Sequence, residues 1–195
     1  MAKKGEENRK RIIEAANDLF YRKGYSRSSF SEVADASGIP KGNFYYYFKS
    51  KEELLDSVID DRLEQMREML ASWDSGFQYP KLRLHRFAQV PLNELEGIVQ
   101  YGCPMGSLNV ELGKDDAGSK AHAAEMFTLF VDWLEKQFRE MGYAEQSRDQ
   151  ALHLLSVAQG ASLLSYVYSD GEILEKEMKR LHDWIESLED KKHGF

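Results

Sequence analysis

Apolar residues recur every three or four positions along almost the whole chain, which is the periodicity of helices and not of strands. The first such stripe consists of Ile12, Ala16, Leu19 and Phe20. We expect its helix to end near Gly24, because glycine readily takes the left-handed conformation that closes a helix. Strictly alternating segments are scarce and no internal repeat is present, so the sequence predicts an all-α fold.

Two short helices should follow the first one. Ser29 and Glu32 have the spacing of a capping box, which predicts that a helix starts there. Gly38 should end this helix, and Pro40 can begin the next at a position that needs no amide hydrogen. Two short helices separated by "GIP" form the outline of a helix-turn-helix, with residues 41–48 as its second helix.

This second helix reads "KGNFYYYF" and has two unlike faces. At about 100° per residue, Phe44 and Phe48 share one face and should anchor the helix inward. The opposite side is polar and aromatic; it consists of Gly42, Asn43 and Tyr46, flanked by Tyr45 and Tyr47. A purely structural aromatic cluster is the alternative, but three adjacent tyrosines cannot all face one core. A flat or grooved partner should therefore meet the outward face.

A long fourth helix is predicted after Ser50, a candidate cap. Its apolar stripe comprises Leu55, Ile59, Leu63, Met66, Leu70 and Trp73. Since no Gly/Ser-rich linker interrupts it, this helix should join two domains rigidly. We expect residues 1–51 to form one domain, with the start of the fourth helix packed on it, and residues 52–195 to form a second, larger helical domain.

The rest of the chain reads as further helices. Pro80 should open a segment to Gln100 that Pro91 kinks or splits. A short helix should follow at "PMGSLNVEL", and longer ones over about 120–141, 146–168 and 172–188.

The last two predicted helices have the pattern of helix-packing surfaces. The final one carries a seam of Leu174, Met178, Leu181, Ile185 and Leu188. The one before it has Ser156 and Gly160 one turn apart, beside Leu152, Leu155, Leu163, Leu164 and Val167. Two such helices can pair with their symmetry mates in a four-helix interface, which predicts a homodimer. The same stripes could instead close the core of one chain, and periodicity does not distinguish the two.

Charge is divided unevenly along the 195 residues, whose net charge is −7. Residues 1–51 carry 11 Lys and Arg against 6 Asp and Glu, a balance of +5, and the remainder is at −12. A basic N-terminal module on an acidic body is expected where only one end meets phosphate. Chance variation among solvated charges is the alternative.

Enzymatic and membrane functions find little support. No run of about 18 uncharged apolar residues occurs, and the N-terminus lacks the apolar region of a signal peptide, so we expect a cytoplasmic protein. Cys103 is the single cysteine, so we expect no disulfide within the chain. The five histidines lack metal-ligand spacing, and no phosphate loop or GxSxG motif is present, so we expect no metal, no cofactor and no catalysis. A thiol enzyme with Cys103 as nucleophile and His122 or His153 as base is a remote alternative, as is a helical adaptor that binds no DNA.

Residues 9–59 resemble the TetR family of bacterial transcriptional regulators. The resemblance lies in the helix ending at "KGY", the serine-rich cap, "VADASGIPKG", "FYYYF" and "KSKEELL", in the family's order and spacing. It implies a repressor that binds double-stranded operator DNA as a homodimer and is released by a small apolar or aromatic effector. In this family the DNA-binding domain would be residues 1–51, and the effector-binding and dimerisation domain would be residues 52–195. The DNA contacts that it implies are Ser28 or Ser29, Lys41, Gly42, Asn43, Tyr45, Tyr46, Tyr47 and Lys51.

The resemblance also implies an effector cavity in the C-terminal body. Its candidate lining comprises Met66, Tyr101, Cys103, Met105, Leu108, Phe127, Phe130, Trp133 and Tyr166, although Met and aromatic stripes often belong to a plain core. Cys103 precedes Pro104 at an expected helix N-terminus, a position that favours a reactive thiolate. Its segment is similar to the "GC" region of family members that sense electrophiles and oxidants. A switch through Cys103 is therefore the alternative to a noncovalent effector, and a buried, inert cysteine is the plainer interpretation.

Overall fold

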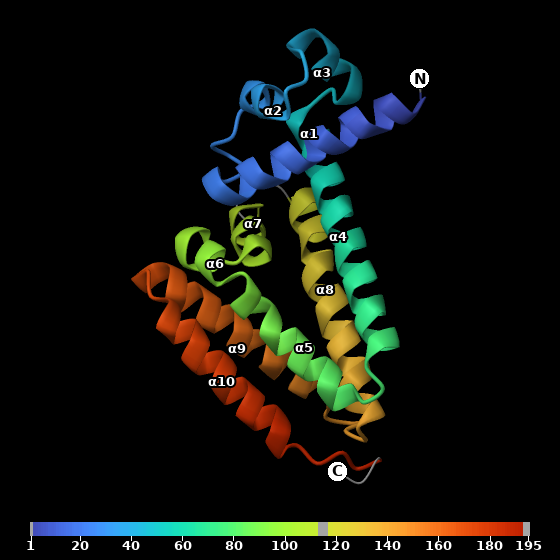
Figure 1. The fold of residues 1–195 in the computed structure, drawn as a ribbon, viewed down its shortest axis with the longest axis vertical. Coiled ribbons are helices and arrows are strands. Elements are labelled where there is room, and N and C mark those ends of the chain that lie inside the picture. Colours follow the sequence, from blue (N-terminus) through green and yellow to red (C-terminus); the bar gives the residue numbers. More distant parts are fainter. Residues whose placement is uncertain (1, 113–116, 193–195) are drawn as a thin grey trace. The chain divides into compact units, whose positions relative to one another are not determined.

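Helices account for every regular element in the part of the chain that the computed structural model describes, residues 2–112 and 117–192 (Figure 1). They are α1 (Ala2–Lys23), α2 (Phe30–Ser37), α3 (Lys41–Tyr47), α4 (Lys51–Gly76), α5 (Pro80–Asn93), α6 (Leu95–Tyr101), α7 (Pro104–Leu112), α8 (Ala117–Glu140), α9 (Ser147–Tyr168) and α10 (Gly171–Ser187). The all-α prediction is confirmed. Within these residues, no helix combines the length and the apolar character needed to cross a membrane.

The chain forms two compact units. Unit 1 comprises Met1–Gln65 and Ser107–Glu125, and unit 2 comprises Met66–Gly106 and Met126–Phe195. Helices α4, α7 and α8 each contribute residues to both units, so no flexible linker separates them along α4. The functional division at residue 51 stays a prediction.

Unit 1 is built around the stripe of α1. Ile12, Ala16 and Phe20 are buried, and they share the core with Val33 of α2 and Phe44 of α3. Burial of large apolar side chains is the main favourable contribution to such a small core.

The caps of unit 1 follow the predicted residues. Ser29 accepts a hydrogen bond from the Glu32 N–H, and the Glu32 carboxylate accepts one from the Ser29 N–H, which completes the capping box. Lys23 and these contacts with Ser29 lower the pKa of Glu32 to about 2. Gly24 and Gly38 lie in the left-handed region, with φ of 89° and 65°, and close the helices that precede them. Ser50 accepts from the Glu53 N–H at the start of α4.

The segment predicted over 80–100 is split in two. Pro91 lies inside α5, and the break falls at Glu94, between α5 and α6. Since proline has no N–H, it removes one bond of the helical ladder and weakens the turn that ends there.

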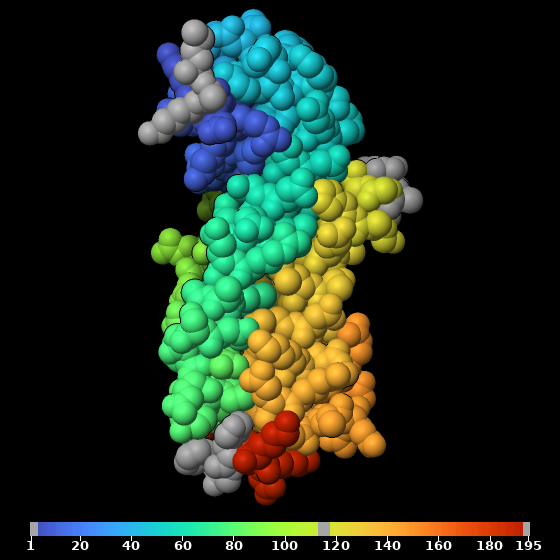
Figure 2. Space-filling view, turned by 90° about the vertical axis from the view of Figure 1, so that its right-hand side faces the viewer, coloured from blue at the N-terminus to red at the C-terminus, as the bar shows by residue number. Residues whose placement is uncertain are grey.

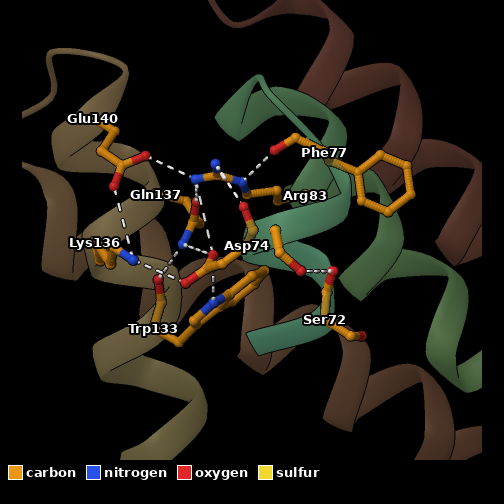
Figure 3. A network of polar contacts seen from close by, with 9 residues as sticks. Ser72, Asp74, Phe77, Arg83, Trp133, Lys136, Gln137 and Glu140 are labelled. Atoms are coloured by element: carbon orange, nitrogen blue, oxygen red, sulfur yellow. Dashed lines mark hydrogen bonds and ion pairs between the residues drawn. The ribbon is translucent and has the colours of Figure 1, made fainter. Parts of the chain in front are cut away.

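A polar network joins three helices at one corner of unit 2 (Figure 3). Arg83 of α5 donates to the Phe77 carbonyl at 2.8 Å and to the Glu140 carboxylate at 2.9 Å. The Asp74 carboxylate of α4 accepts from Trp133 Nε1 at 3.1 Å and from Lys136 Nζ at 2.8 Å, both on α8. Figures 1 and 2 show α4 and α8 side by side in this unit, and the Trp73 and Trp133 rings meet edge to face at 5.7 Å. The network fixes how α4, α5 and α8 meet.

Helices α9 and α10 use their apolar residues differently. In α10, Leu174, Met178, Leu181 and Ile185 are buried against α9 and α5, so this seam closes the core of unit 2. In α9, Leu155 is buried, contrary to the prediction that it belongs to the same surface, whereas the stripe of Leu152, Ser156, Leu163, Leu164 and Val167 is exposed. The seam of α10 is therefore used inside the chain, whereas the stripe of α9 faces solvent.

Candidate nucleic-acid interface

Helix α3 is a short helix held by large anchors. Phe44 is 1 % exposed, and Phe48, which ends the helix, is fully buried. The Phe30 ring of α2 meets the Phe44 ring edge to face, with centroids 4.8 Å apart. These contacts fix which side of α3 faces the solvent, as the helical spacing predicted.

The solvent side of α3 is aromatic and polar. Tyr46 is 80 % exposed and Tyr45 57 %, and Asn43 is exposed as well. At Gly42 no heavy atom lies within 4 Å of the position that a Cβ would take, so the backbone is open there. Tyr47 is half-buried on the flank, where its hydroxyl accepts a hydrogen bond from Asn8. All four predicted side chains thus lie at or beside one surface.

Three lysines border this surface, each held by a neighbour. Lys41 Nζ donates to Ser31 Oγ at 2.7 Å and lies 3.4 Å from Asp35 Oδ2. Lys49 Nζ donates to the Tyr45 carbonyl at 2.6 Å. Lys51 Nζ lies 4.1 Å from the centre of the Tyr25 ring, and partial burial lowers its pKa.

The two serines proposed as cap and phosphate donor have different roles. Ser29 is the N-cap of α2 and is exposed. Ser28 is only 2 % exposed, and its hydroxyl donates to the Gly24 carbonyl at 2.7 Å. Ser28 therefore faces the interior, which corrects its inclusion among the surface contacts.

Several N-terminal cations are used within unit 1. Arg9 donates to Ser57 Oγ at 2.8 Å and its guanidinium lies 5.0 Å from the centre of the Phe48 ring. Arg11 donates to the Ser37 carbonyl at 2.8 Å and so holds the end of α2. The number of positive charges available to a partner is therefore smaller than the balance of +5 suggests.

The side chains predicted to line an effector cavity are spread among different environments. Met105, Leu108, Phe130 and Trp133 are buried; Met66, Tyr101, Cys103 and Phe127 are half-buried; Tyr166 is exposed. Phe130 packs edge to face on Phe87, at 5.0 Å between ring centres, so it is a core residue of unit 2. One surface hollow has a charged lining, which comprises Asp132, Glu135, Lys136, Arg139, Glu140 and Lys192. Tyr166 lies on α9 beside the exposed stripe and not in the core.

Cys103 lies directly before α7, as expected, and its thiol is half-buried. Its sulfur accepts a hydrogen bond from the Gly106 N–H at 3.4 Å and one from Gln159 Nε2 at 3.5 Å. A Cβ at Gly106 would lie 2.8 Å from Gln159 Oε1, so a side chain at this position would displace the Gln159 amide. In the described ranges, no group of three or more His, Cys, Asp or Glu side chains is arranged to hold a metal ion.

Three residues of unit 1 with clear structural roles were not singled out from the sequence. Asn8 of α1 contacts Tyr47 of α3, Glu111 of α7 binds the loop after α1, and Asp56 of α4 contacts His122 of α8. Their partners lie 39, 86 and 66 positions away, so no local pattern could have revealed them.

Comparison with known proteins agrees with this arrangement. The sequence pattern described as "Bacterial regulatory proteins, tetR family" matches residues 12–58, and that of the "Transcriptional regulator LmrA/YxaF-like, C-terminal domain" matches residues 80–180. An uncharacterized HTH-type transcriptional regulator in the lacX 3' region of Lactococcus lactis is 28 % identical over 187 residues, which cover 94 % of this chain and 95 % of the relative.

Solved structures show the same fold. A TetR transcriptional regulator from Legionella pneumophila aligns with a TM-score of 0.79 and 25 % identity, covering 89 % of this chain and 95 % of that one. The reduced form of NemR from E. coli aligns with a TM-score of 0.75 and 19 % identity, covering 90 % and 96 %. The second match is a likeness of fold alone. The helix-turn-helix, the exposed face of α3 and the match over residues 80–180 lead to one conclusion: the chain belongs to the TetR family and is a helix-turn-helix transcriptional regulator, not an enzyme.

Proposed function

We propose that the protein is a homodimeric repressor that reads its operator with the outward face of α3. The observation that carries this proposal is the exposure of Tyr46 and Tyr45 on a helix whose phenylalanines are buried. Large aromatic rings that are exposed to water on a well-anchored helix are typical of a surface that binds a partner. The proposed contacts are Ser29, Lys41, Gly42, Asn43, Tyr45, Tyr46, Tyr47 and Lys51.

The residues of this face have separate roles in the proposal. The open backbone at Gly42 lets α3 approach a groove closely, and the Asn43 amide reads a base edge. Tyrosine hydroxyls donate to phosphate oxygens, and their rings pack on sugars or thymine methyl groups. Lys41 and Lys51 exchange the contacts that they make within unit 1 for contacts with phosphate. Ser29, at the N-terminus of α2, donates to phosphate as well.

Dimerisation is proposed through α9, with the charged outer face of α10 beside it. The exposed stripe of α9 is apolar, and a Cβ built at Gly160 would find no heavy atom within 4 Å, so a partner backbone can approach there. A two-fold axis across α9 makes this stripe self-complementary. Two copies of α3 then read two half-sites in successive major grooves, which one copy alone does too weakly for useful specificity.

Residues 52–195 form the effector-binding and dimerisation domain in this proposal, and residues 1–51 the DNA-binding domain. A small apolar or aromatic ligand enters among the half-buried side chains of unit 2, such as Tyr101 and Phe127. Its binding lowers the affinity of the dimer for the operator. Operator binding and a single thiol are both consistent with a cytoplasmic location.

A second candidate signal is chemical modification of Cys103. Two N–H groups donate to its sulfur, an arrangement that orients the side chain. With one cysteine per chain, sensing requires an adduct, a sulfenic acid or a bond between subunits. A bulky adduct at this position disturbs the start of α7, and α7 ends at residues that hold the loop before α2.

The experiment selects binding sites from a pool of random duplexes and measures the mass of the protein in solution. We expect a palindromic site bound far above random DNA, and a dimer in analytical ultracentrifugation at micromolar concentration. A monomer that enriches no sequence would contradict the proposal.

A further inference from the structure

A hydrogen bond from the side chain of Asn8 links α1 to the recognition helix, α3. Asn8 Nδ2 donates to the Tyr47 hydroxyl oxygen at 3.0 Å, between residues 39 positions apart. We infer that Asn8 is a positioning residue for DNA recognition: it fixes the Tyr47 hydroxyl so that the hydroxyl's hydrogen is free to donate to a phosphate. The inference rests on the proposed function, in which Tyr47 contacts DNA.

The chemistry of the phenol gives this contact its direction. A tyrosine hydroxyl has one hydrogen to donate and lone pairs to accept with. When the Asn8 amide donates to the oxygen, this contact leaves the hydroxyl hydrogen unused. Because phosphate oxygens only accept, a hydroxyl that keeps its hydrogen is the form that binds them.

Asn8 is itself well placed to act as a fixed donor. It lies in the second turn of α1, so its backbone is part of a regular helix. Its neighbour Arg9 donates to Ser57 Oγ of α4, and Arg11 donates to the Ser37 carbonyl of α2. These two contacts hold α1 against the helices on either side of α3, and so they set the position from which the Asn8 amide reaches Tyr47.

The contact also extends to the most exposed tyrosine. The Tyr46 and Tyr47 rings meet edge to face, with centroids 5.5 Å apart and an angle of 89°. Tyr46 is 80 % exposed, and Lys49 Nζ lies 6.0 Å from its ring centre on the surface. Since Tyr47 is the neighbouring ring that Tyr46 packs on, fixing Tyr47 also limits the orientations that Tyr46 can take.

Helix stability does not explain the choice of asparagine at this position. Asn is a poorer helix former than Ala, because its side chain competes for nearby backbone groups. Replacing Asn8 with alanine should therefore leave the fold as stable as before and change only the contact with Tyr47. This separates a positioning role from a purely structural one.

The test is a double-mutant cycle on DNA affinity. Asn8→Ala, Asn8→Asp, Tyr47→Phe and the two double variants are compared by fluorescence anisotropy, on the selected operator and on a random duplex. We expect Tyr47→Phe to weaken operator binding about tenfold, the loss of one hydrogen bond to a charged oxygen. Asn8→Ala should cost about threefold alone and almost nothing in the Tyr47→Phe background, because the hydroxyl that it positions is gone.

Asn8→Asp tests the direction of the hydrogen bond. A carboxylate only accepts, so it draws the Tyr47 hydrogen inward and removes it from the phosphate. Its negative charge also repels DNA, and the same substitution in the Tyr47→Phe background measures that repulsion alone. We expect Asn8→Asp to cost several times more with Tyr47 present than with Phe at that position, with an unchanged thermal unfolding midpoint for Asn8→Ala.

The outcomes separate this inference from the proposed function. Equal effects of Asn8→Ala in both backgrounds would overturn the positioning role while leaving Tyr47 as a contact. An unchanged affinity for Tyr47→Phe would also overturn it, while Lys51 and Asn43 could still carry the proposed interface. If the wild-type protein selects no operator, it is the proposed function that fails.

Discussion

The Glu111 carboxylate of α7 accepts the backbone N–H of Tyr25 at 2.9 Å, and it accepts the next one, from Ser26, at 2.7 Å. Both donors belong to the loop between α1 and α2, in the same compact unit as Glu111. A Cβ added at Gly24 would lie 3.2 Å from a Glu111 oxygen, so the glycine that closes α1 also leaves room for the carboxylate. One acidic side chain thus holds the loop that leads to the cap of α2.

Removing this carboxylate should loosen the loop. Glu111→Ala leaves two backbone N–H groups without their acceptor, and we expect the free energy of unfolding to fall by about 1–2 kcal/mol. Urea denaturation followed by circular dichroism measures the change. Val110→Ala is the control, since Val110 is the neighbouring residue of α7 and is 67 % exposed. A similar loss in both variants would mean that α7 matters only as a helix.

Lys51 and Asn43 should affect DNA binding in different ways. Lys51→Ala removes a phosphate contact, so binding to every sequence weakens and the slope of log affinity against log salt falls by about one unit. Asn43→Ala removes the amide that binds a base edge. It should mainly reduce the preference for operator over random DNA, by about 1–3 kcal/mol. Salt titrations on both duplexes measure these quantities. Equal losses on both duplexes for Asn43→Ala would exclude it as a specificity residue.

Charge on the exposed stripe of α9 should break the dimer. Leu163→Glu places a carboxylate in the middle of a surface that the partner copy would bury. Burying this unpaired charge costs more free energy than the contacts of the interface gain. We expect sedimentation to show a monomer at micromolar concentration and operator affinity to fall with it. Leu82→Glu, on the surface of α5, is the matched control and should stay dimeric. If Leu163→Glu also sediments as a dimer, the interface lies elsewhere.

The stability of unit 1 should depend on the charge of His122. Burial by itself lowers the pKa of this imidazole, but hydrogen bonds to Asp56 and Asp60, at 3.2 and 3.0 Å, outweigh it and leave the pKa raised. Because the pKa of His122 is raised in the folded state, the charged imidazole stabilises the fold fully below the ordinary histidine pKa of about 6.5. This stabilisation is lost as the pH rises through the pKa of His122 in the folded protein.

We therefore expect stability to decline as the pH rises above the ordinary histidine pKa of about 6.5, and His122→Gln to remove this part of the decline. Thermal unfolding across that range, with His153→Gln as the control, isolates the effect. If the unfolding midpoint of His122→Gln depends on pH as it does in the wild type, the two aspartates do not stabilise the charged imidazole.

The proposed switch at Cys103 predicts a separate effect for each of two variants. Cys103→Ser should bind the operator normally but fail to release it on treatment with an electrophile or hypochlorite. Gln159→Leu removes one N–H donor to the sulfur, so the thiol should react more slowly with a maleimide. Gel shifts with and without the reagent, together with the rate of thiol labelling, measure both. Release that is the same in Cys103→Ser and wild type would leave a noncovalent ligand as the inducer.

The sequence by itself determined the helices and the outward face of α3. Helical periodicity, the capping box at Ser29 and the glycines at 24 and 38 depend on residues within about four positions of one another. Such short-range patterns persist whatever the rest of the chain does, which is why α7 appears with the predicted bounds and why Phe44 and Phe48 are buried.

Only the tertiary structure decided which partner each side chain meets. Ser28 and Ser29 are adjacent in sequence, yet packing directs one hydroxyl to the Gly24 carbonyl and the other to the cap of α2. The stripes of α9 and α10 look alike as patterns, but α10 is covered by α9 and α5 while α9 keeps a face exposed. Asn8 meets Tyr47 and Glu111 meets Tyr25 because the fold brings distant segments together. Periodicity fixes the face of a helix on which a residue lies, and packing fixes what that face touches.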